Sequence, residues 1–332
     1  MASLVILVVA GMAMWGLRDD LNSAFRGKPA TAGATARSAL LRYLHAASGR
    51  WTVSGQHNRE PNDQPTLWTA KVHDITGKYP GLWKADLSFH TLEARPGMIA
   101  EAKRQWAAGS LVTLMWHMCP PTQPEPCGWD TPDGVWAKLT DAQWTEMLTP
   151  GRPLNSALIA RFDVVVPLLR QLDDAGVAVL WRPFHEMNDS WAWWGGHPGP
   201  DGSLRLYRLM HDHFRAAGLH NLVWVWSVSD RDPAGISAYD PGPEDSDVAA
   251  MDIWHTDFPT RAGYDAMLRV AGDRPIALGE LSHVPPPELL DEQPRWVYFM
   301  IWAEYLQERA SGDEIKRSYY GPRVRNRDTL GR

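Results

Sequence analysis

Residues 176–188 read GVAVLWRPFHEMN, an apolar run that ends in a cluster of polar and titratable side chains. The first part, residues 176–180, has the continuous apolar character of a strand that is buried on both faces. Directly after it come a guanidinium, an imidazole, a carboxylate and an amide, on Arg182, His185, Glu186 and Asn188. A buried strand that ends in such a cluster is typical of the active-site rim of an α/β barrel.

The same pattern, an apolar run followed by a polar residue, recurs along the chain. Stretches of helical periodicity mostly alternate with short apolar segments at 51–54, 82–85, 111–116, 177–181, 222–226, 248–253, 275–278 and 296–302. Eight strands separated by helices predict an α/β fold, a (β/α)₈ TIM barrel, formed by a single catalytic domain over residues 34–332. Because barrel strands are parallel, one rim should collect the polar residues at the strand ends, namely Gln56, Asp86, His117, Glu186, Asp252 and Glu280.

Two glutamates at this predicted rim carry the chemical argument. Glu186 follows the fourth strand and Glu280 follows the seventh. Two carboxyl groups that face one cleft are the minimum needed to cleave a glycosidic bond, one protonated to assist the leaving oxygen and the other ionised. Burial and neighbouring charges can hold such a pair in opposite protonation states. The alternative is that each glutamate forms a structural ion pair, for instance with Arg182.

Composition narrows the class of partner. The formal net charge of −6 and the isoelectric point near 6.0 argue against nucleic acid as the main partner, because phosphate binding needs a basic face. The chain contains 18 tryptophans, and we expect part of them to fill the core and the rest to line a groove. Flat rings suit a sugar, whose C–H faces pack against them.

Residues 182–195, RPFHEMNDSWAWWG, closely resemble the signature of glycoside hydrolase family 26. Shorter matches occur in the order that this family shows, at 54–57 (SGQH), 116–117 (WH), 223–227 (VWVWS) and 278–280 (LGE). The family consists mainly of endo-β-1,4-mannanases and also includes enzymes that act on mixed-linkage β-glucan or β-1,3-xylan. The resemblance therefore implies a retaining endo-β-glycanase, foremost a β-1,4-mannanase acting on mannan or galactomannan by double displacement. A glycan-binding barrel without turnover is the alternative from another class.

The resemblance also implies roles for individual residues. Glu186 matches the family's general acid/base, and Glu280 matches its nucleophile. Five further positions match residues that orient the carboxylates or shape the sugar site: Arg182, His185, His117, Trp191 and Trp302.

Other rim residues are candidates for substrate contact or for support. Gln56, Asn188 and Asp86 could each bond a sugar hydroxyl or hold a neighbouring group in place. Trp254 stands where the family usually has a tyrosine bonded to the nucleophile, and its indole N–H can still donate one hydrogen bond. Asp189 stands where the family commonly has a glycine. These departures bear on the choice of sugar, whereas the two glutamates that carry the chemistry match the family.

We expect neither a cofactor nor a metal ion. His185-Glu186 lacks the second histidine of a helical zinc motif, and the only two cysteines are too few for a metal site of their own. Cys119 and Cys127 lie in a proline-rich insertion, residues 118–153, and we expect a loop-closing disulfide, with two free thiols as the alternative. A disulfide implies an oxidising compartment.

The N-terminal residues add to the argument on location. Residues 4–17 form an apolar run that is shorter than the ~20 residues needed to span a bilayer and resembles the core of a secretory signal. We assign residues 1–33 to this signal-like segment and a linker. The predicted protein is a secreted or periplasmic monomer that binds a polysaccharide, with a membrane tether through residues 4–17 as the alternative.

Overall fold

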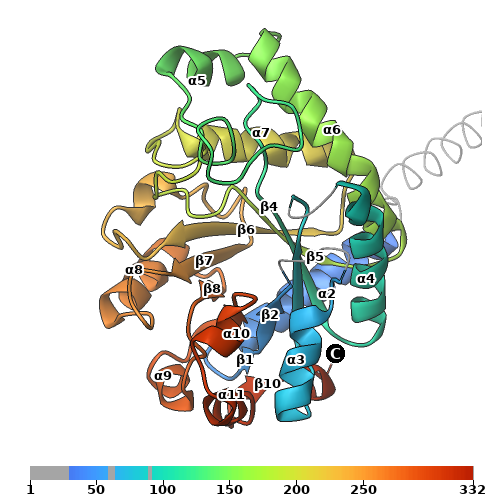
Figure 1. The fold of residues 1–332 in the computed structure, drawn as a ribbon, viewed down its shortest axis with the longest axis vertical. Coiled ribbons are helices and arrows are strands. Elements are labelled where there is room, and N and C mark those ends of the chain that lie inside the picture. Colours follow the sequence, from blue (N-terminus) through green and yellow to red (C-terminus); the bar gives the residue numbers. More distant parts are fainter. Residues whose placement is uncertain (1–29, 59–63, 89–91, 332) are drawn as a thin grey trace, which may run out of the picture. The chain divides into compact units, whose positions relative to one another are not determined.

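Parallel strands close into a barrel in this computed structural model, which describes residues 30–58, 64–88 and 92–331 (Figure 1). The sheet runs in chain order from β2 to β9, and β9 pairs with both β8 and β2, so the sheet closes on itself. The predicted (β/α)₈ barrel is therefore confirmed. The strands are β1 (Thr52–Val53), β2 (Gly55–His57), β3 (Leu82–Asp86), β4 (Leu111–Trp116), β5 (Val179–Pro183), β6 (Leu222–Ser229), β7 (Val248–Ile253), β8 (Ile276–Leu281), β9 (Trp296–Ile301) and β10 (Val324–Arg325).

The eight predicted apolar segments all form strands of this barrel, with small shifts at their ends. The first strand of the barrel consists of two short pieces, β1 and β2. The short β10 near the C-terminus pairs with β1. The fourth strand begins at Val179, two residues later than predicted, and runs through Pro183. This shift carries Arg182 into the strand itself, which fixes the direction of its side chain.

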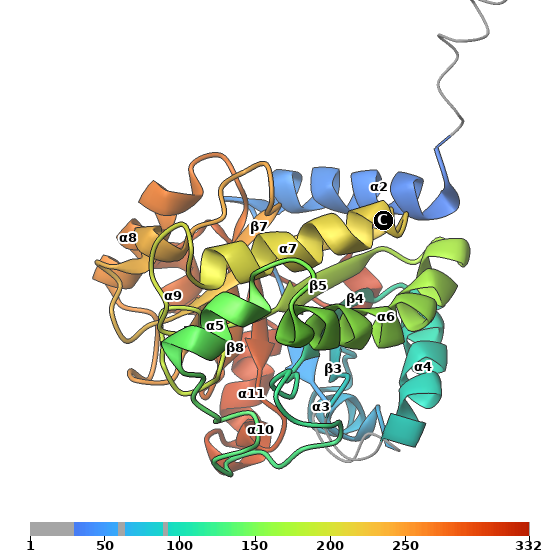
Figure 2. The ribbon, with the colours of Figure 1, turned by 90° about the horizontal axis from the view of Figure 1, so that it is seen from above.

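Helices surround the strands (Figures 1 and 2). The predicted helical stretches between the strands are present, and α6 begins at Pro153, because proline suits the first turn of a helix. The helices are α2 (Ala32–Ala47), α3 (Leu67–Thr76), α4 (Arg95–Ala107), α5 (Asp141–Met147), α6 (Pro153–Asp174), α7 (Ser203–Ala216), α8 (Arg261–Ala271), α9 (Pro287–Glu292), α10 (Tyr305–Glu308) and α11 (Gly312–Tyr319), with short 3₁₀ turns at Leu92–Ala94, Ile236–Tyr239 and Arg327–Thr329.

Strand residues alternate between the barrel interior and the helical layer, as pleated strands must. In β4, Val112, Leu114 and Trp116 join the apolar core between strands and helices, whereas Leu111 belongs to the core inside the barrel. Helix α2 buries Leu40 and Leu44 in that inner core. This packing places α2 across the amino-terminal end of the strands and leaves the carboxyl end for the polar rim.

Three segments differ from the sequence-based expectation or lie beyond the described residues. The insertion at 118–153, for which no helix was predicted, contains α5, whose first turn has a capping box between Thr140 and Gln143. Helix α2 begins at Ala32, inside the segment predicted as a linker. The signal-like run at residues 4–17 lies outside the described residues. Within the described ranges, no helix has both the length and the apolar character to cross a bilayer.

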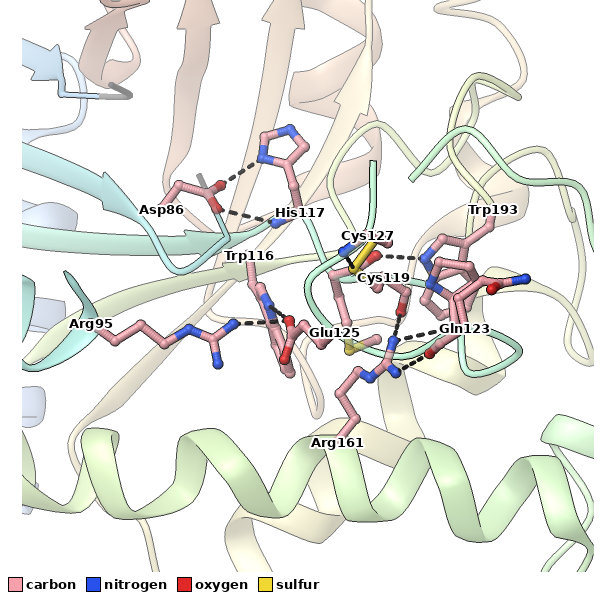
Figure 3. Close-up of a disulfide and its surroundings, with 12 residues drawn as sticks. Asp86, Arg95, Trp116, His117, Cys119, Gln123, Glu125, Cys127, Arg161 and Trp193 are labelled. Atoms are coloured by element: carbon pink, nitrogen blue, oxygen red, sulfur yellow. Dashed lines mark hydrogen bonds and ion pairs between the residues drawn. A yellow bond between two sulfur atoms is a disulfide. The ribbon is translucent and has the colours of Figure 1, made fainter. Parts of the chain in front are cut away.

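The insertion is closed by the predicted disulfide (Figure 3). The Cα atoms of Cys119 and Cys127 lie 5.8 Å apart. Arg161 of α6 donates to the carbonyls of Cys119, Pro120 and Gln123, so this helix holds the first part of the insertion (Figure 3). Because the loop follows His117 directly, these contacts fix one wall of the barrel mouth.

Removing this disulfide should lower the stability of the protein. The bridge closes a loop of eight residues' separation. Chain entropy alone predicts that the double substitution Cys119→Ser/Cys127→Ser costs about 2.5 kcal/mol in the free energy of unfolding. Urea denaturation of the oxidised protein and of the variant measures the difference. An unchanged free energy of unfolding would mean that Arg161 and its neighbours already restrain the loop without the bridge.

Candidate active site

Four charged side chains meet inside the barrel at the carboxyl end of the strands. Lys84 of β3 lies with its Nζ 2.5 Å from Oε1 of Glu280 on β8. Arg182 of β5 pairs through Nη1 with Oδ2 of Asp252 on β7 at 2.6 Å, and its Nη2 also binds Glu280. Each of these side chains is at most 2% exposed. Buried charges are tolerated when they are paired in this way.

A glycine makes room for this arrangement. Gly279 precedes Glu280 on β8, and a Cβ atom built there would collide with Oδ1 of Asp252 and lie 3.4 Å from Nη1 of Arg182. Only a residue without a side chain lets this pair sit against the strand. The LGE motif at 278–280 therefore supplies both the carboxylate and the space that its neighbours need.

Glu186 approaches the group from the end of β5. Its backbone has φ of +55°, a left-handed conformation that is uncommon outside glycine and that often accompanies functional sites. Its side chain accepts a hydrogen bond from the indole of Trp191. One oxygen each of Glu186, Asp252 and Glu280 lie within 4.8 Å of one another. The turn after β5 thus brings Glu186 face to face with Glu280.

The electrostatics of the group favour different protonation states for its carboxyls. Burial raises the pKa of Glu186 well above its usual value, and the charges of Asp252 and Glu280 raise it further. The hydrogen bond from Trp191 acts in the opposite direction. Burial also raises the pKa of Asp252, to about 6, against the opposing charge of Arg182. Glu186 is therefore the carboxyl most disposed to hold a proton.

The charges of the group balance when Glu186 is protonated. Two carboxylates, Asp252 and Glu280, then face two cations, Arg182 and Lys84. The three carboxyls are close enough to hold a metal ion. However, two of them are already paired with buried cations, whose charges would repel a metal ion. The arrangement is better suited to proton transfer and to attack by a carboxylate.

A cleft of roughly 380 Å³ opens above this group. Its floor includes Glu186 and Glu280, and much of its wall is aromatic. It is lined by His117, Trp129, Trp136, His185, Glu186, Asp189, Trp191, Arg231, Trp254, His255, Glu280, Trp302, Glu304 and Tyr305. Aromatic walls around two acidic side chains are a suitable site for a carbohydrate chain.

Two histidines stand together in this cleft. The rings of His117 and His185 lie 4.5 Å apart and meet edge to face. Burial lowers the pKa of His185 well below its usual value. Its ring is therefore neutral near neutral pH, whichever protonation state Glu186 has. Asp86 accepts from Nδ1 of His117 at 2.6 Å and fixes the orientation of that ring. Asp86 also accepts from the backbone N–H groups of Ser88 and His117, which is the supporting role considered for it, and Asp252 is the acceptor that orients Arg182.

Two other predicted site residues lie outside the lining of the cleft. Gln56 is buried beneath it and donates from Nε2 to backbone carbonyls, including that of Ile301 at 3.3 Å. Asn188 exchanges two hydrogen bonds with the backbone of Ser229 and so ties the turn after β5 to the end of β6. Both amides hold strand ends in place and neither lines the cleft.

Trp254 and Trp302 form part of the wall. Their ring centroids lie 5.9 Å apart, and Trp302 stacks on His57 at 4.2 Å. The hypothesis that the Trp254 indole donates to Glu280 is not supported among the described residues, where Lys84 and Arg182 bind that carboxylate. The side chains that bind Glu280 in the described part of the chain are therefore these two cations.

Sequence reasoning missed several residues of the site. Lys84 was placed on a strand without a role, although a lysine within the apolar run LWKAD is a signal of a buried pair. Trp129 and Trp136 come from the insertion, and Arg231 comes from the loop after β6. Arg231 binds Asp189 through Nε at 3.0 Å, so the residue that replaces the family's glycine anchors a cation at the cleft. No local pattern connects these distant segments.

Comparison with known proteins agrees with this geometry. Residues 30–329 match the model of glycosyl hydrolase family 26. The chain belongs to glycosyl hydrolase family 26. Among solved structures, this family 26 chain is similar to GH26A from Muricauda sp. MAR_2010_75, with 32% identity and a TM-score of 0.84 over 89% of this chain and 97% of that one.

Other similar proteins carry names that describe an activity. A β-mannanase from a symbiotic protist of the termite Reticulitermes speratus, solved with a gluco-manno-oligosaccharide, is 25% identical, with a TM-score of 0.77 over 91% of this chain and 96% of that one. Mannan endo-1,4-β-mannosidase from Thermothelomyces thermophilus is 29% identical over 87% of this chain. A mannan endo-1,4-β-mannosidase from Caldalkalibacillus mannanilyticus is 29% identical over 79%. The chain spans only 60% and 54% of the length of these last two relatives.

Proposed function

We propose that this family 26 protein is a retaining endo-β-1,4-mannanase that hydrolyses mannan or galactomannan. The observation that carries the proposal is the meeting of Glu186 and Glu280 on the floor of one cleft, with an oxygen of each within 4.8 Å. Retaining glycosidases place their two carboxyl groups ~5–5.5 Å apart, whereas inverting ones need ~6.5–9.5 Å to admit a water. The short separation favours attack by a carboxylate over attack by water.

In the first step, Glu280 acts as the nucleophile and Glu186 as the acid. An oxygen of Glu280 bonds to the anomeric carbon while the glycosidic C–O bond breaks, and the proton of Glu186 passes to the leaving oxygen. The raised pKa of Glu186 favours its protonated form, which can give that proton, and the two cations bind and orient the carboxylate of Glu280. The opposite environments of the two carboxyls thus match their two roles.

In the second step, water replaces Glu280 on the sugar. The oxygen of the water bonds to the anomeric carbon while Glu186, now ionised, takes a proton from that water. The electron pair of the ester bond returns to Glu280. Two inversions restore the original β-configuration. His117, His185, Trp191, Trp254 and Trp302 line the cleft and would contact the sugars on either side of the cleaved bond.

A substrate panel tests the proposal directly. The protein is incubated with mannan, galactomannan, barley β-glucan and β-1,3-xylan, and the released oligosaccharides are identified. We expect release of a series of manno-oligosaccharides from mannan and galactomannan, which is the product pattern of an endo-acting enzyme. Release from barley β-glucan or β-1,3-xylan alone would assign another substrate to the same chemistry. No release from any of them, with binding retained, would favour a glycan-binding barrel.

We also propose that the protein works outside the cytoplasm as a monomer. The Cys119–Cys127 disulfide supports this proposal, because such bridges persist in oxidising compartments. The signal-like character of residues 4–17 supports it from the sequence. Fractionation of expressing cells, followed by gel filtration of the recovered protein, tests both statements. A reduced pair of thiols in a cytoplasmic fraction would contradict the first.

Losing the indole N–H of Trp191 should move the alkaline limb of the pH–activity profile. That N–H bonds to the ionised form of Glu186 and lowers its pKa. Trp191→Phe keeps a ring and removes the donor, so the pKa of Glu186 should rise and the acid should stay protonated to higher pH. A charged hydrogen bond of this kind corresponds to a shift of about one pH unit. The measurement is the pH dependence of kcat/KM for a soluble manno-oligosaccharide.

Trp136→Phe is the matched control for this shift. Trp136 lines the same cleft and is 43% exposed. The control makes the same change of ring without touching Glu186, so its alkaline limb should coincide with that of the wild type. If the alkaline limb of Trp191→Phe does not move, the limb does not report the titration of Glu186.

A further inference from the structure

Lys84 is a buried cation that the mechanism above does not require to touch the substrate. It lies in the middle of β3, and its side chain is 1% exposed. Its Nζ lies 2.5 Å from Oε1 of Glu280 and 3.5 Å from the carbonyl oxygen of Gly279. The cleft-lining residues do not include it. A lysine is seldom buried this deeply unless it has a paired charge.

The two cations beside Glu280 are not equivalent. Arg182 divides its guanidinium between Asp252 and Glu280 and also donates to Ser227 at 2.9 Å. Among the described residues, Lys84 forms an ion pair with Glu280 and with no other carboxylate. Arg182 is thus shared between two carboxylates. Lys84 is left as the counter-charge that belongs to Glu280.

We propose that Lys84 is a positioning residue, which holds Glu280 in line with the anomeric carbon and stabilises its carboxylate as the bond to the sugar breaks. This inference rests on the proposed retaining mechanism. Both cations bind the same oxygen, Oε1 of Glu280, so neither of them occupies Oε2. Two donors on Oε1 fix the orientation of the carboxylate more firmly than Arg182 alone before the sugar arrives, and such preorganisation lowers the barrier without further rearrangement.

The two chemical steps should respond differently to Lys84. In the first step Glu280 gives up its negative charge as its oxygen bonds to the anomeric carbon, so a nearby cation favours the starting state. In the second step the carbon–oxygen ester bond breaks, its electron pair returns to Glu280, and the same cation favours the departing carboxylate. Lys84 should therefore accelerate the release of the covalent sugar more than its formation.

The surroundings of Lys84 make its charge sensitive to alkaline pH. Burial, followed by the charge of Arg182, lowers the pKa of Lys84 to about 8, while Glu280 and Asp252 oppose this effect. The groups that face it from neighbouring elements are Glu280 on β8, Arg182 on β5, Asp252 on β7, His57 paired with it on β2, His185 after β5 and the Trp302 ring after β9. An arginine at position 84 would keep its charge through this range.

The test compares Lys84→Met, Lys84→Arg and wild type on an activated aryl β-mannoside, whose first step is fast. For Lys84→Met we expect kcat to fall about 10- to 100-fold, the range of a charge-assisted hydrogen bond. We also expect kcat/KM to fall less and the covalent glycosyl-enzyme to accumulate, seen by mass spectrometry as one added sugar on Glu280. Lys84→Arg should recover most of kcat and show little accumulation. Lys71→Met, on the exposed face of α3, is the matched control.

Several outcomes would overturn the inference. An unchanged kcat in Lys84→Met would do so, as would equal losses in kcat and kcat/KM without any covalent sugar, because a structural defect has that signature. If Lys84→Met does not fold, the pH dependence of turnover is compared between wild type and Lys84→Arg. Turnover of the wild type should decline above about pH 8, whereas turnover of Lys84→Arg should not. Coincident profiles would reject the role. Wild-type turnover in the same assay tests the proposed function separately.

Discussion

Replacing Glu280 by alanine is expected to lower the turnover of mannan by at least about 10⁴-fold, because the first step loses its nucleophile. Binding of manno-oligosaccharides should persist, since the cleft walls remain. The substitution leaves Lys84 and Arg182 buried beside an empty space, and an unpaired buried charge costs stability. Glu280→Gln, which keeps the shape of the side chain, should be equally inactive and closer to the wild type in thermal stability.

External azide sharpens this prediction. In Glu280→Ala, azide can occupy the space beside the two cations and attack the anomeric carbon of an activated β-mannoside from the face that Glu280 used. The expected product is an α-mannosyl azide, identified by NMR. Glu304→Gln, a change of another carboxyl in the same cleft, should keep turnover within a few-fold of the wild type. Full activity in Glu280→Ala would exclude a covalent role for this residue.

Replacing Glu186 by alanine should divide substrates according to their leaving groups. Polysaccharide needs a proton on its departing oxygen, and losing general acid catalysis should slow its cleavage by about 10²- to 10⁴-fold. In a dinitrophenyl glycoside the leaving group is dinitrophenolate, which departs without protonation. The first step on this substrate should therefore stay fast. Its turnover should then be limited by the second step, in which Glu186 activates water. Azide should restore that turnover and give a β-mannosyl azide, with retained configuration.

The comparison between substrates carries the test of Glu186. Equal losses on mannan and on the activated glycoside would contradict the acid role, because a proton donor matters only where the leaving group needs one. Glu186 contacts Trp191, so a general disturbance of the turn after β5 is the competing explanation. Trp191→Phe provides the control, since it disturbs the same turn and keeps the carboxyl.

The sequence predicted the barrel because its signal is repeated eight times. Each apolar run is short, each ends in a polar residue, and only a parallel closed sheet explains both properties. The boundaries were less certain, as at β5, since apolar residues continue beyond the hydrogen-bonded part of a strand. Helix α5 was overlooked because its capping box at Thr140 lies in a segment rich in proline and glycine.

The sequence predicted part of the candidate site. Contacts between residues close in the chain were predicted, and contacts between residues far apart in the chain were missed. Glu186 and Trp191 lie five residues apart, and a strand-end motif can indicate such a pair. Lys84 and Glu280 are 196 residues apart in the chain. Gln56 and Asn188 have the composition of sugar-binding residues, yet their amides bond to backbone groups at neighbouring strand ends.

By itself, the sequence determined the architecture and the identity of the two carboxyl groups, because both depend on patterns within single strands and the turns that follow them. The tertiary structure alone decided which cations stand beside Glu280 and which burial and charges raise the pKa of Glu186. Those properties depend on burial and on distances between strands β3, β5, β7 and β8. Such distances are set only when the sheet closes, since no local pattern measures the gap between side chains on separate strands.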